Sequence, residues 1–137
     1  MTTIFSKIIS KEVPADIVYE DEFALAFLDI NPVQPGHTLV IPKTPSIDGL
    51  VCGPEDLARL IVIGQKVGLA LKEVVQCDGI NFIMNNGEAA GQEVFHTHLH
   101  VIPRFSDDGA FEEPIVGEYE EGEATSLADT LATTIKN

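Results

Sequence analysis

The sequence predicts an α+β fold with an antiparallel sheet of about five strands, one short helix and one long helix. Short apolar or alternating segments bounded by turn residues recur along most of the chain, whereas helical spacing persists over only one long stretch. Sequential strands joined by hairpin-like turns favour an antiparallel sheet over a doubly wound parallel one. The 137 residues suffice for one compact core. We therefore expect one domain over residues 1–105, followed by an acidic C-terminal extension over residues 106–137.

The first part of the domain is predicted to contain the short helix and three strands. The helix covers residues 4–10, has Phe5 and Ile8 on one side and ends before Pro14. The strands are separated by an acidic turn and by a loop rich in proline, and they cover residues 17–19, 23–28 and 37–41.

The long helix follows Gly53, with Pro54 at a position that suits the first turn. Apolar residues recur at helical spacing over residues 57–71 and widen into a surface that covers nearly every side of the helix. Such a helix needs partners on two sides, and Gly64 and Gly68 leave a bare patch for close approach. We expect the chain to associate with itself through this helix.

Two more strands are predicted after the long helix. They cover residues 79–84 and 94–102, with a turn at residues 85–87 between them and Pro103 ending the second strand. Within the acidic extension, residues 124–135 have the pattern of a capped helix.

The charge of the chain excludes some partners. With 22 acidic and eight basic residues, the net charge is −14 at pH 7. Such a chain repels both the phosphate backbone of nucleic acids and anionic lipid, so we expect neither a nucleic-acid polymer nor a membrane as partner. Nine acidic residues follow Phe105, which indicates a solvated tail. A small anionic ligand would have to be held locally, by histidines, backbone N–H groups and Lys43 or Arg104.

The sequence contains neither a targeting signal nor a paired cysteine motif. No run of about 18 apolar residues occurs, and Lys7 interrupts the N-terminal segment too early for a signal peptide. We therefore expect a cytoplasmic protein. Cys52 and Cys77 form no Cys-x-x-Cys pair and are expected to be isolated reduced thiols.

Three of the four histidines stand in one row. On a strand, His96, His98 and His100 would project to the same side at intervals of about 6.6 Å. Three hypotheses fit such a row. Neutral imidazoles bind zinc, and an imidazole near neutral pH can attack phosphorus and then leave. The third possibility is a nucleotide-binding module without catalysis.

The residues around the row favour phosphate chemistry over a metal site. The loop at residues 87–92 is built of small residues whose N–H groups can turn toward an anion, and Asn85 adds an amide donor. A zinc site would need further ligands, for which His37, Glu88 and Glu93 are candidates.

The run His-Thr-His-Leu-His-Val-Ile at residues 96–102 resembles the signature of the histidine-triad (HIT) nucleotide hydrolases and transferases, in which three histidines alternate with apolar residues. Thr97 departs mildly from that alternation. The resemblance runs in order from about residue 4 to residue 104 and is weakest in the long helix. Its further blocks lie at residues 4–9, 12–14, 27–32, 35–43, 85–87 and 91–94.

The resemblance implies a mechanism. His98 would attack the α-phosphorus of a nucleotide to form a nucleotidyl-histidine, with its other ring N–H held by a backbone carbonyl. His100 would hydrogen-bond the phosphate oxygens, and His96 and His37 would orient the nucleophile. Contacts to the phosphate and the leaving group would come from Asn85 and from the backbone of Gly91, Gln92, Glu93 and Val94.

The resemblance also implies how the nucleoside is held and how the chains assemble. Asp29 matches an acid that accepts hydrogen bonds from the ribose hydroxyls. An apolar purine slot matches Phe5, Ile8, Val13, Phe27 and Ile30. Relatives of this kind are homodimers whose sheets join into one continuous sheet. The expected substrates are purine phosphoramidates, acyl-nucleotides or dinucleoside polyphosphates, and no cofactor is expected.

Three departures from the family pattern bear on function. Residues 3–6 read Thr-Ile-Phe-Ser where many bacterial members have a zinc-binding Cys-x-x-Cys, and Pro45-Ser46 replace a family histidine. We therefore expect no structural zinc. Glu93 stands where Ser or Thr can donate to the leaving group, and an ionised carboxylate cannot donate. The tail after Phe105 also differs, so substrate choice does not carry over.

Overall fold

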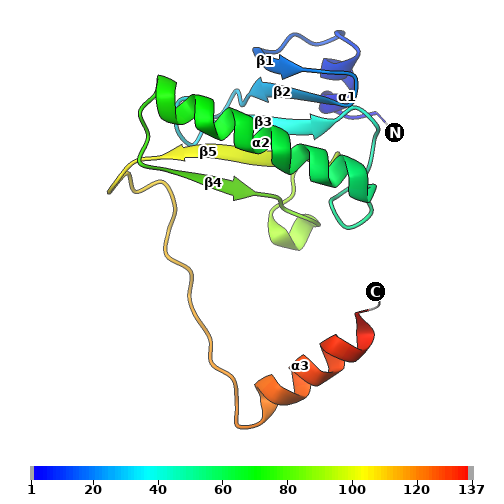
Figure 1. The fold of residues 1–137 in the computed structure, drawn as a ribbon, viewed down its shortest axis with the longest axis vertical. Coiled ribbons are helices and arrows are strands. Elements are labelled where there is room, and N and C mark those ends of the chain that lie inside the picture. Colours follow the sequence, from blue (N-terminus) through cyan, green and yellow to red (C-terminus); the bar gives the residue numbers. More distant parts are fainter. Residues whose placement is uncertain (1, 136–137) are drawn as a thin grey trace.

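The computed structural model describes residues 2–135 and has the predicted architecture: one five-stranded antiparallel sheet with a short and a long helix (Figure 1). The strand order is β1-β2-β3-β5-β4, so β1 and β4 form the two edges. The elements are α1 (Ile4–Ile9), β1 (Ile17–Glu20), β2 (Ala24–Leu28), β3 (Thr38–Pro42), α2 (Pro54–Val74), β4 (Gly79–Ile83), the 3-10 turn η1 (Glu88–Ala90), β5 (Leu99–Arg104) and α3 (Glu123–Thr134).

The two faces of the sheet carry separate apolar clusters, because side chains alternate along each strand. On one face Ala26 and Val40 pack beneath α2. On the other face Phe27 and Leu39 pack against α1. The small residues of β2 thus lie under the long helix, and its large residues lie under the short one.

Helix α2 lies close to the sheet because of its glycines. A Cβ added at Gly64 would lie 2.7 Å from Cδ2 of Leu99, so only glycine fits there without a shift. The predicted bare patch therefore faces the chain's own sheet and not a second molecule. The outer side of α2 still exposes large apolar residues, including Ile61 and Leu69. None of the helices within residues 2–135 combines the length and the apolar composition that crossing a bilayer requires.

The strand predicted at residues 94–102 is shifted in the structure. Strand β5 begins only at Leu99 and continues through Pro103 to Arg104. Pro103 is tolerated because the pairing with β3 ends at Val101, leaving only β4 beside the proline. His96 and His98 consequently lie in an irregular segment before the strand.

Helix α1 begins with a capping box formed by Thr3 and Ser6, which stand where many bacterial members of the resembling family have cysteines. The Thr3 hydroxyl accepts from the Ser6 amide at 3.2 Å, and the Ser6 hydroxyl accepts from the Thr3 amide at 2.8 Å. This reciprocal capping box satisfies two N–H groups at the start of the helix. It fixes the helix that carries Phe5 toward the histidines.

The C-terminal arm, residues 106–135, leaves the domain after β5. The Asp108 carboxylate accepts hydrogen bonds from Nε and Nη2 of Arg104 at 2.9 and 2.7 Å, which ties the first turn of the arm to the sheet. Beyond Ala110 every described residue is exposed. The arm runs extended to α3, which stands apart from the domain beyond β4 (Figure 1). The helix expected at residues 124–135 is thus present, at Glu123–Thr134.

Candidate active site

All four histidines converge on the face of the sheet that carries α1. His37 lies just before β3, His96 and His98 precede β5, and His100 lies within β5 opposite Leu39. The ring centroids of His98 and His100 are 5.0 Å apart, and those of His37 and His100 are 5.1 Å apart. Rings brought together from two neighbouring strands form one contiguous cluster.

His98 is held in a single tautomer by the main chain. Its Nδ1 lies 2.7 Å from the carbonyl oxygen of His96, an acceptor, so Nδ1 carries the hydrogen and donates it. The lone pair of the ring is then on Nε2. Phe5 packs edge-on against this ring at 5.1 Å between centroids. An unprotonated nitrogen on a fixed ring has the properties of a nucleophile.

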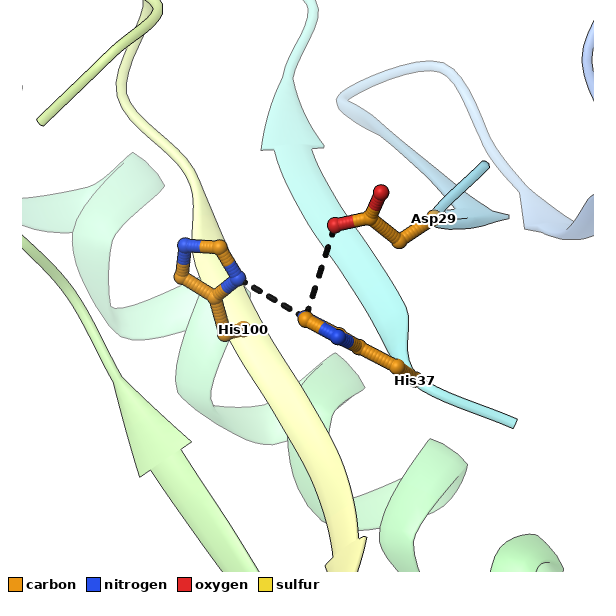
Figure 2. A group of neighbouring side chains, drawn as sticks. All are labelled: Asp29, His37 and His100. Atoms are coloured by element: carbon orange, nitrogen blue, oxygen red, sulfur yellow. Dashed lines mark hydrogen bonds and ion pairs between the residues drawn. The ribbon is translucent and has the colours of Figure 1, made fainter. Parts of the chain in front are cut away.

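A hydrogen-bond chain fixes the tautomers of His37 and His100 as well (Figure 2). The Val33 N–H donates to Nδ1 of His37 at 3.0 Å, so neutral His37 carries its hydrogen on Nε2. This Nε2–H donates to Nδ1 of His100 at 2.9 Å. His100 therefore has its own N–H on Nε2, on the side of the ring away from His37. That N–H has no hydrogen-bond partner within the described residues.

His96 is a positioning residue whose ring has no contact with solvent. Its ring is completely buried, and its Nε2 lies 2.8 Å from the carbonyl oxygen of Pro42. Its Nδ1 has no hydrogen-bond partner within residues 2–135. The His96 ring thus fastens the segment before β5 to the end of β3, while its carbonyl orients His98.

Burial lowers the pKa of all four histidines below the ordinary value of 6.5. The effect is largest at His100, whose pKa falls to about 4 because it is buried and lies beside His98 and His37. Asp29 opposes the shift at His37, His98 and His100, but desolvation outweighs it. The cluster is therefore neutral at pH 7, as the tautomer assignments require.

Asp29 follows β2 and lies beside the imidazole pair. Its Oδ1 accepts the Asn31 N–H at 2.9 Å, and its Oδ2 lies 3.6 Å from Nε2 of His37. With a neutral His37 this second contact is neither an ion pair nor a hydrogen bond, since 3.6 Å is too long. One carboxylate oxygen thus remains available to accept from a ligand.

The nearest approach to a metal site among residues 2–135 is the group Asp29, His37 and His100, whose ligand atoms lie within 4.8 Å of one another. The tautomer of His37 does not suit a metal ligand. Nδ1 of His37 already accepts the Val33 N–H, so Nε2 holds a hydrogen where a ligand needs a lone pair. Glu88 and Glu93, the further ligands considered from sequence, are not part of this group.

The side chain of Gln92 holds the loop before the histidines, residues 87–92, in its conformation. Its Oε1 accepts the Gly87 N–H at 2.8 Å, and its Nε2 donates to the carbonyls of Ile47 and Val94 at 2.7 and 3.0 Å. The Gln92 side chain therefore holds the loop in place, and its amide group is fully used within the fold. The amides of Gln92 and Gly91 are also bonded inside the loop.

The remaining donors of this loop are free for a ligand. The Glu93 and Val94 N–H groups have no hydrogen-bond partner within the described residues. Asn85 is half-buried, and a Cβ added at Gly91 would lie 3.6 Å from its Nδ2. Gly91 has φ +94, which favours glycine, so the bend that brings the loop beside Asn85 depends on this residue.

The predicted purine slot separates into core and surface residues. Ile8 and Phe27 are buried in the cluster beneath α1, and Val13 packs at its margin. Phe5, also buried, contacts both His96 and His98 through its ring. Ile30 is 86% exposed. Of this set, Ile30 offers its whole side chain to a ligand.

Several site residues were not predicted from the sequence. They act through the main chain, as the Val33 amide and the Pro42 carbonyl do, and such groups leave no mark in a pattern of side chains. Ser46 was also missed, although it bonds to the buried Thr97 through its hydroxyl at 2.6 Å. The signal for this pair was Thr97 itself, a polar residue at an apolar position of the motif.

Comparisons with known proteins identify the family of this chain. The family model described as "HIT domain" matches residues 10–107. An uncharacterized HIT-like protein of Borreliella burgdorferi is 52% identical over 108 residues, covering 77% of this chain and 78% of its own. The crystal structure of a HIT family protein from Bacillus anthracis superposes with a TM-score of 0.89 at 40% identity, covering 97% of this chain and 96% of that one.

A third similar protein has a name that mentions a ligand. A hypothetical histidine triad nucleotide-binding protein from Sulfolobus tokodaii has a TM-score of 0.74 at 37% identity, covering 94% of this chain and 88% of that one. Three findings indicate the same family: the matching family model, the sequence identity over three-quarters of the chain and the shared fold. The chain belongs to the HIT family.

Proposed function

We propose that this protein is a purine nucleotide hydrolase or nucleotidyl transferase that cleaves at the α-phosphate, with His98 as the nucleophile. The observation that carries the proposal is the bond between Nδ1 of His98 and the His96 carbonyl, which leaves the lone pair on Nε2. In the first step the Nε2–phosphorus bond forms, and the bond from phosphorus to the leaving group breaks with its electron pair. In the second step water or another acceptor attacks phosphorus and releases His98.

The phosphate would be bound by neutral donors in place of cations. His100, which follows the nucleophile in the chain, offers its Nε2–H. The Glu93 and Val94 amides and the Asn85 side chain, which precede the nucleophile, offer further N–H groups. Preorganised donors of this kind stabilise a transition-state oxyanion by about 3 kcal/mol each. The absence of lysine or arginine from this set accords with a chain of strongly negative charge.

The nucleoside would be bound at the other end of the cluster. The free Oδ2 of Asp29 accepts hydrogen bonds from ribose hydroxyls, and Ile30 with Phe5 supplies apolar surface for a purine. The proposed substrates are phosphoramidates, acyl-nucleotides and dinucleoside polyphosphates of purine nucleosides. The Sulfolobus relative's name, a nucleotide-binding protein, supports the same ligand class.

The chain is also proposed to form a homodimer with a continuous sheet. Strand β4 is an edge strand with Phe82 exposed, and α2, which contacts β4, exposes Ile61 and Leu69 on its outer side. Pairing of two β4 edges would satisfy free backbone groups and cover this surface together.

The experiment that tests the catalytic proposal is a rapid quench with adenosine 5′-phosphoramidate, followed by mass spectrometry of the protein. Wild type is expected to show an adenylyl adduct on His98. The His98→Ala variant should lose turnover by a factor of about 10³ or more while still binding AMP. His100→Asn should still form the adduct, more slowly, because Nε2 of His98 is intact. AMP binding without adduct or turnover in wild type would identify a binding module instead.

A further inference from the structure

An apolar groove lies on the α2 face of the sheet, opposite the histidines. It has a volume of about 470 Å³ and lies between the C-terminal half of α2 and strands β1 to β3. Val67, Ala70 and Val74 form its helical wall, and Val18 and Leu28 lie on its strand side. Binding sites for small molecules are typically pockets of about 300–1,000 Å³ with apolar walls and few polar groups. The groove therefore has the size and the lining of such a site.

The walls of this groove are open to solvent. Val18 and Val74, one on each wall, are 49% and 79% exposed. The groove lies toward β1, whereas α3 stands apart beyond β4, at the other edge of the sheet (Figure 1). Within residues 2–135 no other part of the chain covers these walls, so a ligand with an apolar body would gain by removing them from water.

The polar groups of the groove leave one donor for a ligand. The Thr38 hydroxyl donates to the Gly36 carbonyl at 2.8 Å, and the Tyr19 hydroxyl donates to Asp21 at 2.9 Å. Among the described residues, Lys66 is the only charged side chain in the lining, and it forms no ion pair with any of them. A ligand that matches this lining has an apolar body and one anionic group.

The cation and the apolar wall lie in line along α2. The lining runs along the helix from Lys66 to Val75, a span of about 14 Å. The Val75 end is closed by Gly36, which has φ +102. A Cβ added there would lie 2.9 Å from Cδ2 of Leu71, so the loop before β3 approaches the helix this closely because it has a glycine. An elongated ligand with its charge at one end fits this arrangement.

We propose that the groove binds a free medium-chain fatty acid, with the carboxylate beside Lys66 and the chain along Val67, Ala70 and Val74. Because the chain has a net charge of −14, an anionic ligand needs a local cation, and Lys66 supplies it. The same charge disfavours an anionic lipid surface, so the ligand is a free molecule and not a membrane lipid. The proposal goes beyond the catalytic function and does not depend on it, because the groove and the histidines lie on opposite faces of the sheet.

The first test is a titration of the ¹⁵N-labelled full chain with decanoate, kept below its micelle concentration, and followed by amide chemical shifts. Decanoate should give saturable shifts at Gly36 and over residues 66–75. Decylamine, which has a similar chain and a cationic head, should bind about tenfold more weakly. A lack of saturable shifts at the groove, as would follow if another segment or a second copy filled it, would overturn the proposal. Equal binding of the two probes would overturn the role of Lys66.

The second test uses matched variants of α2, each checked by thermal unfolding. K66E should weaken decanoate binding about tenfold and reverse the preference between the two probes, whereas K72E, the same charge change outside the groove, should retain the preference. A70W should fill the groove and abolish the binding of both probes, whereas Q65W, outside the groove, should retain it. Undiminished decanoate binding in folded K66E or A70W would overturn the proposal. Phosphoramidate turnover should be unchanged in K66E, so a failure of either proposal is distinguishable from a failure of the other.

Discussion

The hydroxyls of Ser46 and Thr97 lie 2.6 Å apart and join two of the positions at which this chain departs from the family's sequence pattern. The Thr97 amide also donates to the Ser46 carbonyl at 2.8 Å. Thr97 is buried between His96 and His98, so this double contact fixes the segment that orients both rings. The two departures compensate one another.

Removing one of these hydroxyls should destabilise the protein more than removing both. Thr97→Val leaves the half-buried Ser46 hydroxyl without its side-chain partner and should lower the free energy of unfolding by about 1 kcal/mol. The double variant Ser46→Ala/Thr97→Val should lose less than the sum of the single variants, because neither hydroxyl is then left unpaired. Urea unfolding of the four proteins measures the coupling. Additive losses would show that the pair is not a unit.

Turnover should fall on the acidic side of pH 6.5. The nucleophile must be unprotonated, and burial lowers the pKa of His98, so the rate should be level at neutral pH and fall only below 6.5. A pH–rate profile of kcat/KM on a phosphoramidate checks this. A rate that falls between pH 8 and 7 would contradict the assignment of a neutral, buried nucleophile.

Stability should follow the same ionisation. The pKa of His100 is about 4 in the fold and 6.5 in the unfolded chain, so the unfolded state binds more protons between these values. The free energy of unfolding should therefore fall as the pH drops from 6.5 toward 4. Urea midpoints of wild type and His100→Asn, compared across this window, isolate the contribution of this ring. Equal slopes in the two proteins would contradict it.

Glu93 should discriminate against anionic leaving groups. Its amide is free to bind a ligand, but its carboxylate would repel the polyphosphate portion of a dinucleoside polyphosphate. Glu93→Ser should raise kcat/KM for dinucleoside polyphosphates by about tenfold relative to the phosphoramidate, which corresponds to about 1.4 kcal/mol. Glu88→Ser, an equal charge change in the same loop, is the control. The same ratio in both variants would attribute the effect to net charge alone.

Two glycines of α2 should respond in opposite directions to alanine. A Cβ at Gly64 would lie 2.7 Å from Leu99, so Gly64→Ala should destabilise by about 1–3 kcal/mol. A Cβ at Gly68 would lie 3.7 Å from its nearest neighbour, an ordinary contact, so Gly68→Ala should be neutral or stabilise by up to about 1 kcal/mol through helix propensity. Thermal unfolding measures both. If Gly64→Ala kept wild-type stability, Leu99 or the sheet would have to shift to make room for the added methyl group.

The sequence predicted the elements well where their side chains repeat with a clear period. The long helix, the first four strands and the terminal helix lie within a few residues of their predicted positions. The strand before Pro103 was placed too early because alternation continues through His96 and His98, although no neighbouring strand pairs with them. Alternation indicates an extended chain, and only pairing makes that chain a strand.

At the site, the sequence predicted which residue types gather but not how their hydrogens are placed. The row of three histidines and the separate His37 do converge, and Asp29 lies beside them. The tautomers depend on main-chain groups that every residue possesses, such as the Val33 amide, and so no residue type signals them. The residue type of Gln92 does not indicate whether its side chain binds a ligand or holds the loop, and in the structure its partners are all internal.

The acceptor behind His98 is an amide carbonyl and not a carboxylate, and this choice bears on both halves of a two-step phosphoryl reaction. An anionic partner would make the ring more basic and the bond from nitrogen to phosphorus harder to break. A neutral carbonyl selects the reactive tautomer without adding that electron density, so the same imidazole can form the bond and then depart. In the proposed reaction, the main chain of His96 would thus favour both the formation and the breakdown of the covalent intermediate.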